Sequence, residues 1–226
     1  MDFNTGTGGT EGPGGSSSEP SSPPPRTSGV AAGGEFNYTD PVQSFVSTVR
    51  RIVLQPVDFF RGILRRGDFI NPLIFAIICY EVSAILGGII ALALGTRNVG
   101  GFLISIILTP IGAAIGLFIG AGILHLLVML IVGSRNGGFE ATFRVGAYVG
   151  VTQLVAWLSA IPILGILISI AIFVYGIFLS IVGIREVHTT TTGRAALVVL
   201  IPVAIVLLLV FLVIGAAAVF IFSQQQ

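Results

Sequence analysis

The fold of this chain follows from residues 195–222, AALVVLIPVAIVLLLVFLVIGAAAVFIF. This stretch has no charged side chain, and it exceeds the roughly 20 apolar residues that a helix needs to cross a hydrocarbon core about 30 Å thick. A backbone inside lipid must satisfy its own hydrogen bonds, so the stretch has to be helical. It therefore predicts a transmembrane helix.

Four similar stretches precede it, at residues 72–95, 102–132, 143–160 and 161–184. Hydrophobic residues make up 54% of the 226 residues and charged residues only 9%, far below the quarter that is typical of soluble domains. The predicted fold class is all-α. We expect a polytopic membrane helix bundle with about five transmembrane helices, preceded by amphipathic interfacial helices.

Two of the stretches have lengths that do not suit one crossing. Residues 102–132 are too many, and we expect Pro110 to divide them because proline removes a helical hydrogen bond. Residues 143–160 are few, and they run into the next stretch as WLSAIPILG. We predict a hairpin that turns at Pro162 and Gly165, with a re-entrant pair as the alternative.

Arginine sets the orientation, because it is the only basic residue type apart from two histidines. With five spans, ten of the eleven arginines fall on the side of the N-terminus, and Arg97 falls on the other side. Positive charge is retained in the cytoplasm. The prediction is a cell-membrane protein with a cytoplasmic N-terminus and an outside C-terminus.

The residues before the first span divide into two parts. Residues 1–40 are rich in Gly, Ser and Pro and are predicted to be a disordered cytoplasmic tail. Residues 41–70 have apolar side chains at helical spacing and predict amphipathic helices, either at the membrane interface or packed onto the ends of the spans. The transmembrane domain is 71–223, and Asn71 is expected to cap its first helix.

Basic side chains in this leader are candidate contacts for anionic lipid head groups. They are Arg50, Arg51, Arg61, Arg65 and Arg66. The predicted partners are membrane lipids and a cytoplasmic or membrane protein. Nothing in the sequence indicates nucleic-acid binding, and a homo-oligomer stays open.

Two ionisable side chains stand out inside the spans, Glu81 and His125. At 1.5 Å per residue they lie roughly 14 and 10 Å below the cytoplasmic surface on neighbouring helices, so they are a candidate polar pair. The pair either belongs to a proton- or ion-linked path, or it is a register contact in which a protonated Glu81 bonds His125, a serine or a carbonyl. His188 lies in a connector and is expected to face solvent.

Small residues recur at four-residue spacing in the second stretch, at Gly112, Gly116 and Gly120. Such a smooth strip permits close helix packing in membranes. We expect the partner to be a span of the same chain, with a second protomer as the alternative.

No motif for catalysis or cofactor binding occurs. The chain has no GxxxxGK[ST], no HExxH, no GxSxG and only one cysteine, Cys79. Two histidines offer little for metal ligation. We predict no catalytic, cofactor-binding or metal-binding residues, and a protein that is not an enzyme.

The run QPVDFFRGILRRGDFINPLIFAII, from Gln55, resembles the start of the first span in the Yip-domain (Ypt/Rab-interacting protein) family of five-span membrane proteins. FEATFRVGAY, IPILG and VYGIFLSIVGIREVHTTTTGRAALVVLIP are similar to the distal half of that family, and the resemblance covers residues 55–222. It implies a polytopic protein with a cytoplasmic N-terminus. Eukaryotic members act in Golgi and endoplasmic-reticulum trafficking and bind prenylated small GTPases. This chain lacks their DLYGP-type element and is more similar to the prokaryotic branch.

Two functions are consistent with these features. The first is a non-enzymatic membrane organiser or adaptor of the Yip-like type. The second is a small transporter or channel component that uses a polar path through Glu81 and His125. We favour the first, because the spans consist overwhelmingly of apolar residues and offer no polar lumen.

Overall fold

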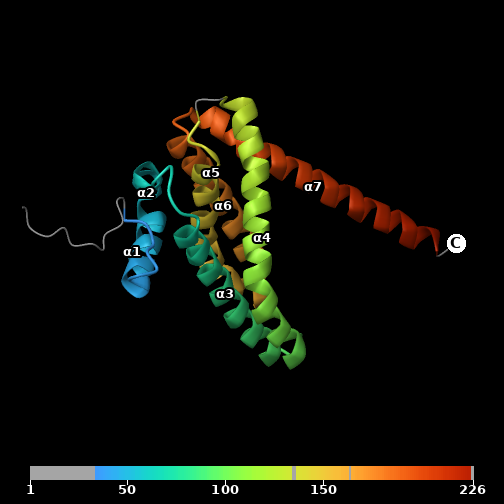
Figure 1. Cartoon of the computed structure of the whole chain (residues 1–226). Coiled ribbons are helices and arrows are strands. Elements are labelled where there is room, and N and C mark those ends of the chain that lie inside the picture. Colours follow the sequence, from blue (N-terminus) through green and yellow to red (C-terminus); the bar gives the residue numbers. More distant parts are fainter. Residues whose placement is uncertain (1–33, 134–135, 163, 225–226) are drawn as a thin grey trace, which may run out of the picture.

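The computed structural model describes residues 34–133, 136–162 and 164–224. This part of the chain contains helices and turns and no strand, which confirms the all-α fold class (Figure 1). The elements are α1 (Pro41–Leu54), α2 (Pro56–Gly62), α3 (Ile70–Ala93), α4 (Val99–Ile131), α5 (Phe139–Val149), the 3₁₀ helix η1 (Gly150–Ala160), α6 (Leu164–Val187) and α7 (Thr192–Ser223). The predicted disordered tail lies, over residues 1–33, outside the described residues.

Four of these helices are long and apolar enough to cross a membrane: α3, α4, α6 and α7. The remaining predicted span, the third in chain order, consists of α5 followed by η1, each of 11 residues. A 3₁₀ helix rises about 2.0 Å per residue against 1.5 Å in an α-helix, so α5 and η1 together extend about 38 Å. That length matches the roughly 36 Å of the 24-residue helix α3. The stretched backbone thus gives α5 and η1 together the length of a span, although the helices that are both long and apolar enough to cross are the other four.

Helix α4 does not break at Pro110. It is one helix of 33 residues with Pro110 inside it, so the expected division of this stretch is wrong. Proline leaves the carbonyl of Ile106 without its helical donor, and membrane helices tolerate this where nearby hydroxyl groups and neighbouring helices support the backbone. Beside the freed carbonyl of Ile106, the Thr109 hydroxyl donates to the neighbouring carbonyl of Ser105, 2.7 Å away.

Helices α3, α4 and α6 run alongside α5 and η1 as a bundle, while α7 leaves it at an angle (Figure 1). Helices α5 and α6 approach each other closely at a small residue of α6. A side-chain carbon added at Gly183 of α6 would lie 2.6 Å from Val145 of α5 and 3.2 Å from the ring of Phe60. Gly138 has φ +89°, a conformation that favours glycine, and it turns the chain into α5.

The leader packs onto the flank of this bundle. Ile52 of α1 and Phe59 and Phe60 of α2 are buried. The ring of Phe45 lies 5.2 Å from that of Phe75 on α3. The structure thus shows that these amphipathic helices pack against the spans, and their placement at the membrane interface stays a prediction.

Two boundaries of the leader differ from the prediction. Glu35 and Phe36 are buried, at 5% and 1% exposed, so packed structure begins within the last residues of the predicted tail, although residues 38–40 are exposed. Helix α3 begins at Ile70, so Asn71 lies inside the helix and does not cap it. Asp68 caps the start of the helix instead, because its Oδ1 accepts the backbone N–H of Asn71 at 3.1 Å.

Candidate functional site

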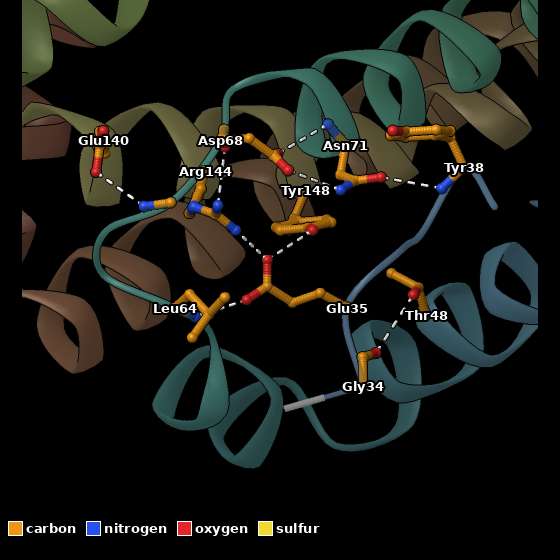
Figure 2. Close-up of polar contacts among 11 residues, drawn as sticks. Gly34, Glu35, Tyr38, Thr48, Leu64, Asp68, Asn71, Glu140, Arg144 and Tyr148 are labelled. Atoms are coloured by element: carbon orange, nitrogen blue, oxygen red, sulfur yellow. Dashed lines mark hydrogen bonds and ion pairs between the residues drawn. The ribbon is translucent and has the colours of Figure 1, made fainter. Parts of the chain in front are cut away.

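The most elaborate polar site in the described residues surrounds the carboxylate of Glu35 (Figure 2). Arg144 and Tyr148 lie one turn apart on α5, and both donate to Oε2 of Glu35; the Tyr148 hydroxyl does so at 2.8 Å. The backbone N–H of Leu64, just after α2, donates to Oε1 at 2.6 Å. Donors from two parts of the chain, α5 and the connector after α2, thus converge on one buried acid.

A second set of contacts holds the residues around this carboxylate. The second terminal nitrogen of the guanidinium, Nη2 of Arg144, donates to the carbonyl of Asp68 at 2.8 Å. The carboxylate of Glu140, one turn earlier on α5, accepts the N–H of Gly67 at 3.0 Å. These bonds clasp the connector between α2 and α3 against α5.

The Glu35–Arg144 ion pair is buried at both ends, with side-chain exposures of 3% and 4%. Removing one partner from such a pair costs about 3–5 kcal/mol, because it leaves an uncompensated buried charge. The ring of Tyr148 packs between Phe59 and Phe75, at 5.0 and 5.2 Å between centroids. The Nε of Arg144 is buried without a hydrogen-bond partner among the described residues.

A second polar cluster joins two histidines through one threonine. The Thr142 hydroxyl lies 3.0 Å from Nδ1 of His125 and 3.0 Å from Nε2 of His188. The N–H of Gly137 donates to Nδ1 of His188 at 2.9 Å, so in the neutral imidazole the proton sits on Nε2 and faces Thr142. This cluster ties the α6–α7 connector to α4 and α5.

His188 is 1% exposed, so the expectation that it faces solvent is wrong. The pKa of His188 is lowered to about 4, mainly by burial, with the nearby His125 and Arg65 contributing in the same direction. The reason for the error is local. Thr142 and the Gly137 N–H offer His188 two hydrogen-bond partners that a reading of its own connector does not reveal.

Glu81 and His125 are not brought together. His125 bonds Thr142, and Oε1 of Glu81 is buried without a hydrogen-bond partner within the described ranges. The predicted polar pair is thus absent as a direct contact.

The arginines of the leader divide into two groups. Arg61 pairs with Glu186 of α6 at 3.1 Å, and Arg51 lies over the ring of Phe59 at 5.9 Å. Arg61 is nevertheless exposed, as are Arg50, Arg65 and Arg66, whereas Arg51 is half-buried. Packing therefore already engages two of the five candidate lipid contacts.

The glycine strip of α4 has no packing partner within the described part of the chain. A side-chain carbon added at Gly112, Gly116 or Gly120 would meet nothing within 4 Å. The expectation that another span of this chain covers the strip is wrong, because the space beside all three glycines is open although α3, α5 and α7 all contact α4.

Sequence reasoning missed Glu35 and Arg144. Glu35 lies in the predicted tail, and Arg144 is predicted only to be one of the ten arginines on the side of the N-terminus. One signal was available. Glu140, Arg144 and Tyr148 recur at four-residue spacing in FEATFRVGAY and so share one face of a helix, a pattern that predicts a polar contact surface.

Comparison with known proteins gives one match. A family model, the Yip1 domain, matches residues 50–214, well over half of the chain. No curated protein and no solved structure matches the chain. The matched range holds Arg144, Tyr148 and the Thr142 cluster, whereas Glu35 lies before it. This chain belongs to the Yip1-domain family of membrane proteins.

Proposed function

We propose that this protein is a non-enzymatic membrane organiser or adaptor of the Yip-like type. The bundle anchors it in the membrane, and the α1–α2 leader meets anionic lipid head groups and a protein partner on the cytoplasmic side. The observation that carries the proposal is the outer face of α1.

Helix α1 is apolar on two sides. Its inner side chains, such as Phe45 and Ile52, pack on the bundle. Its outer side chains remain uncovered, with Val42 76% and Leu54 65% exposed. A helix held on a membrane bundle with a second apolar face suits the boundary between head groups and acyl chains.

Charge beside this face supports a contact with head groups. A shallow cavity of about 320 Å³ at the end of α1 is lined by Ser47, Arg50, Arg51, Leu54 and Gln55. The exposed Arg65 and Arg66 follow α2. Arginine forks and hydroxyl donors match phosphate oxygens.

The charge distribution also supports the orientation. Arg61, Arg185 and Arg194 lie at the end of the bundle that carries the leader, whereas Arg97 lies between α3 and α4 at the opposite end. The positive-inside bias favours a cytoplasmic N-terminus and an outside C-terminus in the cell membrane.

The alternative, a transporter or channel component with a path through Glu81 and His125, has less support. His125 is hydrogen-bonded to Thr142 of α5, and Oε1 of Glu81 has no hydrogen-bond partner among the described residues. Lone buried polar atoms do not form a continuous path for an ion.

Lipid selectivity tests the proposal. The full chain in nanodiscs of mixed phosphatidylcholine and phosphatidylglycerol is expected to enrich the anionic lipid, measured by native mass spectrometry of the co-purified lipids. Arg50→Gln with Arg66→Gln should reduce the enrichment about twofold or more, and Arg97→Gln, the control at the other end, should not. Equal enrichment in all three proteins would contradict the proposal.

A further inference from the structure

The Glu35 site has the form of a receptor and its ligand. The donors belong to α5 and to the connector that follows α2, and they are Arg144, Tyr148 and the N–H of Leu64. The carboxylate comes from a separate extended segment that precedes α1 (Figure 2). The donors also lie within the Yip1-domain match, and Glu35 lies outside it.

The receptor part is held in shape by contacts that do not involve Glu35. Arg144 is fixed by the carbonyl of Asp68, and the connector is fixed by the bond between Gly67 and Glu140. Aromatic packing fixes the ring of Tyr148. Each donor therefore has a support in this structure that does not involve Glu35.

An empty receptor would hold an uncompensated cation. The side chain of Arg144 is only 4% exposed, and its ion pair within the described residues is the one with Glu35. The nearby carboxylate of Glu140 is engaged by the N–H of Gly67. A buried guanidinium without a counter-charge is costly, and its planar fork suits a carboxylate, so such a site would accept another one.

The ligand segment is otherwise lightly held. Besides Glu35, residues 34–40 are attached to the bundle by the buried ring of Phe36, which packs near Phe75, and by the N–H of Tyr38, which donates to Oδ1 of Asn71 at 2.9 Å. Other side-chain bonds join Gly34 and Asn37 to Thr48 and Ser44 of α1 itself. The side chain of Tyr38 is itself 53% exposed. Glu35 is thus the principal polar attachment of the segment that leads into α1.

We propose that Arg144, Tyr148 and the N–H of Leu64 form a carboxylate-binding site whose tethered occupant is Glu35, so that residues 34–40 are a latch for α1. The ligand class is an alkyl carboxylate, either free or on an acidic side chain. Displacement of Glu35 by such a group releases the segment. This inference goes beyond the organiser function and does not depend on it.

Rescue by acetate tests the site. Glu35→Ala in the full detergent-solubilised chain should lower the thermal midpoint by about 5–15 °C, the shift expected for a broken buried pair. Sodium acetate at about 100 mM should recover part of that loss relative to sodium chloride at equal ionic strength. Asp40→Ala, which removes an exposed acid without a capping bond from the same segment, should show neither effect.

The double variant Glu35→Ala, Tyr148→Phe should lose most of the acetate rescue, because one donor is missing. Equal effects of acetate and chloride on Glu35→Ala would overturn the proposal.

The rate of trypsin cleavage provides a second test of the latch, which can be used even if Glu35→Ala folds poorly. Glu35→Gln keeps the shape of the side chain and removes its charge. Trypsin cleavage at Arg50 or Arg51 should then become about tenfold faster than in Asp40→Asn, because cleavage follows the population of the released segment. Equal cleavage rates in the two variants would overturn the latch.

Discussion

Residues 34–40 and the distal half of α7 differ in what holds them to the rest of the chain. The first segment is short and not helical, yet a buried carboxylate, an aromatic ring and a backbone bond fix it. The second is long, helical and strongly apolar, yet its side chains from Ile205 to Ile214 are exposed and the helix leads away from the bundle (Figure 1). Apolar length places a helix in lipid, whereas specific polar contacts and packing fix a segment on a partner.

The largest effect is expected where the first segment is attached. Arg144→Gln leaves Glu35 buried without its counter-charge and should lower the free energy of unfolding by about 3–5 kcal/mol. Thermal unfolding in detergent measures this loss. Arg97→Gln, at the exposed turn between α3 and α4, should cost at most about 1 kcal/mol. Similar losses in both variants would show that the buried pair at Arg144 is no more important for stability than the exposed Arg97 at the opposite end of the bundle.

Acid should weaken the same end of the bundle through His188. Its pKa is lowered to about 4 in the folded chain, so between pH 6.5 and 4 the unfolded chain binds more protons. Stability is fully present above about pH 6.5 and should fall by on the order of 3 kcal/mol as pH drops through this window. His188→Asn should flatten the profile of the thermal midpoint against pH. An unchanged slope in that variant would show that other groups cause the acid sensitivity.

The Thr142 bridge should give an intermediate effect. Thr142→Val keeps the shape of the side chain but removes the hydroxyl shared by His125 and His188, and we expect a loss of about 1–2 kcal/mol. Thermal unfolding of Thr142→Val beside Thr142→Ser, which keeps the hydroxyl, separates the hydrogen bond from the packing. Comparable losses in the two variants would argue against the bridge.

The smallest effects are expected in the apolar regions. Leu208→Ala on distal α7 removes a side chain that is 58% exposed and should change stability by less than about 0.5 kcal/mol. If Glu81 is protonated, as in the predicted register contact, Glu81→Gln should leave folding and membrane insertion largely intact, since a protonated carboxyl and an amide are alike in shape and charge. Membrane fractionation and thermal unfolding measure both. Loss of the Glu81→Gln protein from the membrane would show that the ionised acid is required.

The spans were predictable because apolar length alone defines them, and the Yip-domain resemblance was predictable because its motifs lie in sequence order. The path of the polypeptide within a span was not predictable. The continuity of α4 through Pro110 depends on local backbone support, and the extension of the third span depends on the 3₁₀ geometry of η1. Neither the continuity of α4 nor the 3₁₀ geometry of η1 can be recognised from the hydropathy of the sequence.

The polar clusters were harder to foresee, because each joins residues that are far apart in the chain. Glu35 and Arg144 are 109 residues apart, and Thr142 and His188 are 46 apart. Such partners are defined by the packing of the helices. Single-segment reasoning assigned Glu35 to a tail and His188 to an exposed connector for this reason.

A double-mutant cycle on Glu35 and Arg144 tests the central claim most directly. Thermal or denaturant unfolding is measured for the parent chain, Glu35→Gln, Arg144→Gln and the double variant. If the buried pair fixes the N-terminal segment, the two single losses should not add, and the coupling energy should reach about 2 kcal/mol or more. Losses that add to within about 0.5 kcal/mol would contradict the account.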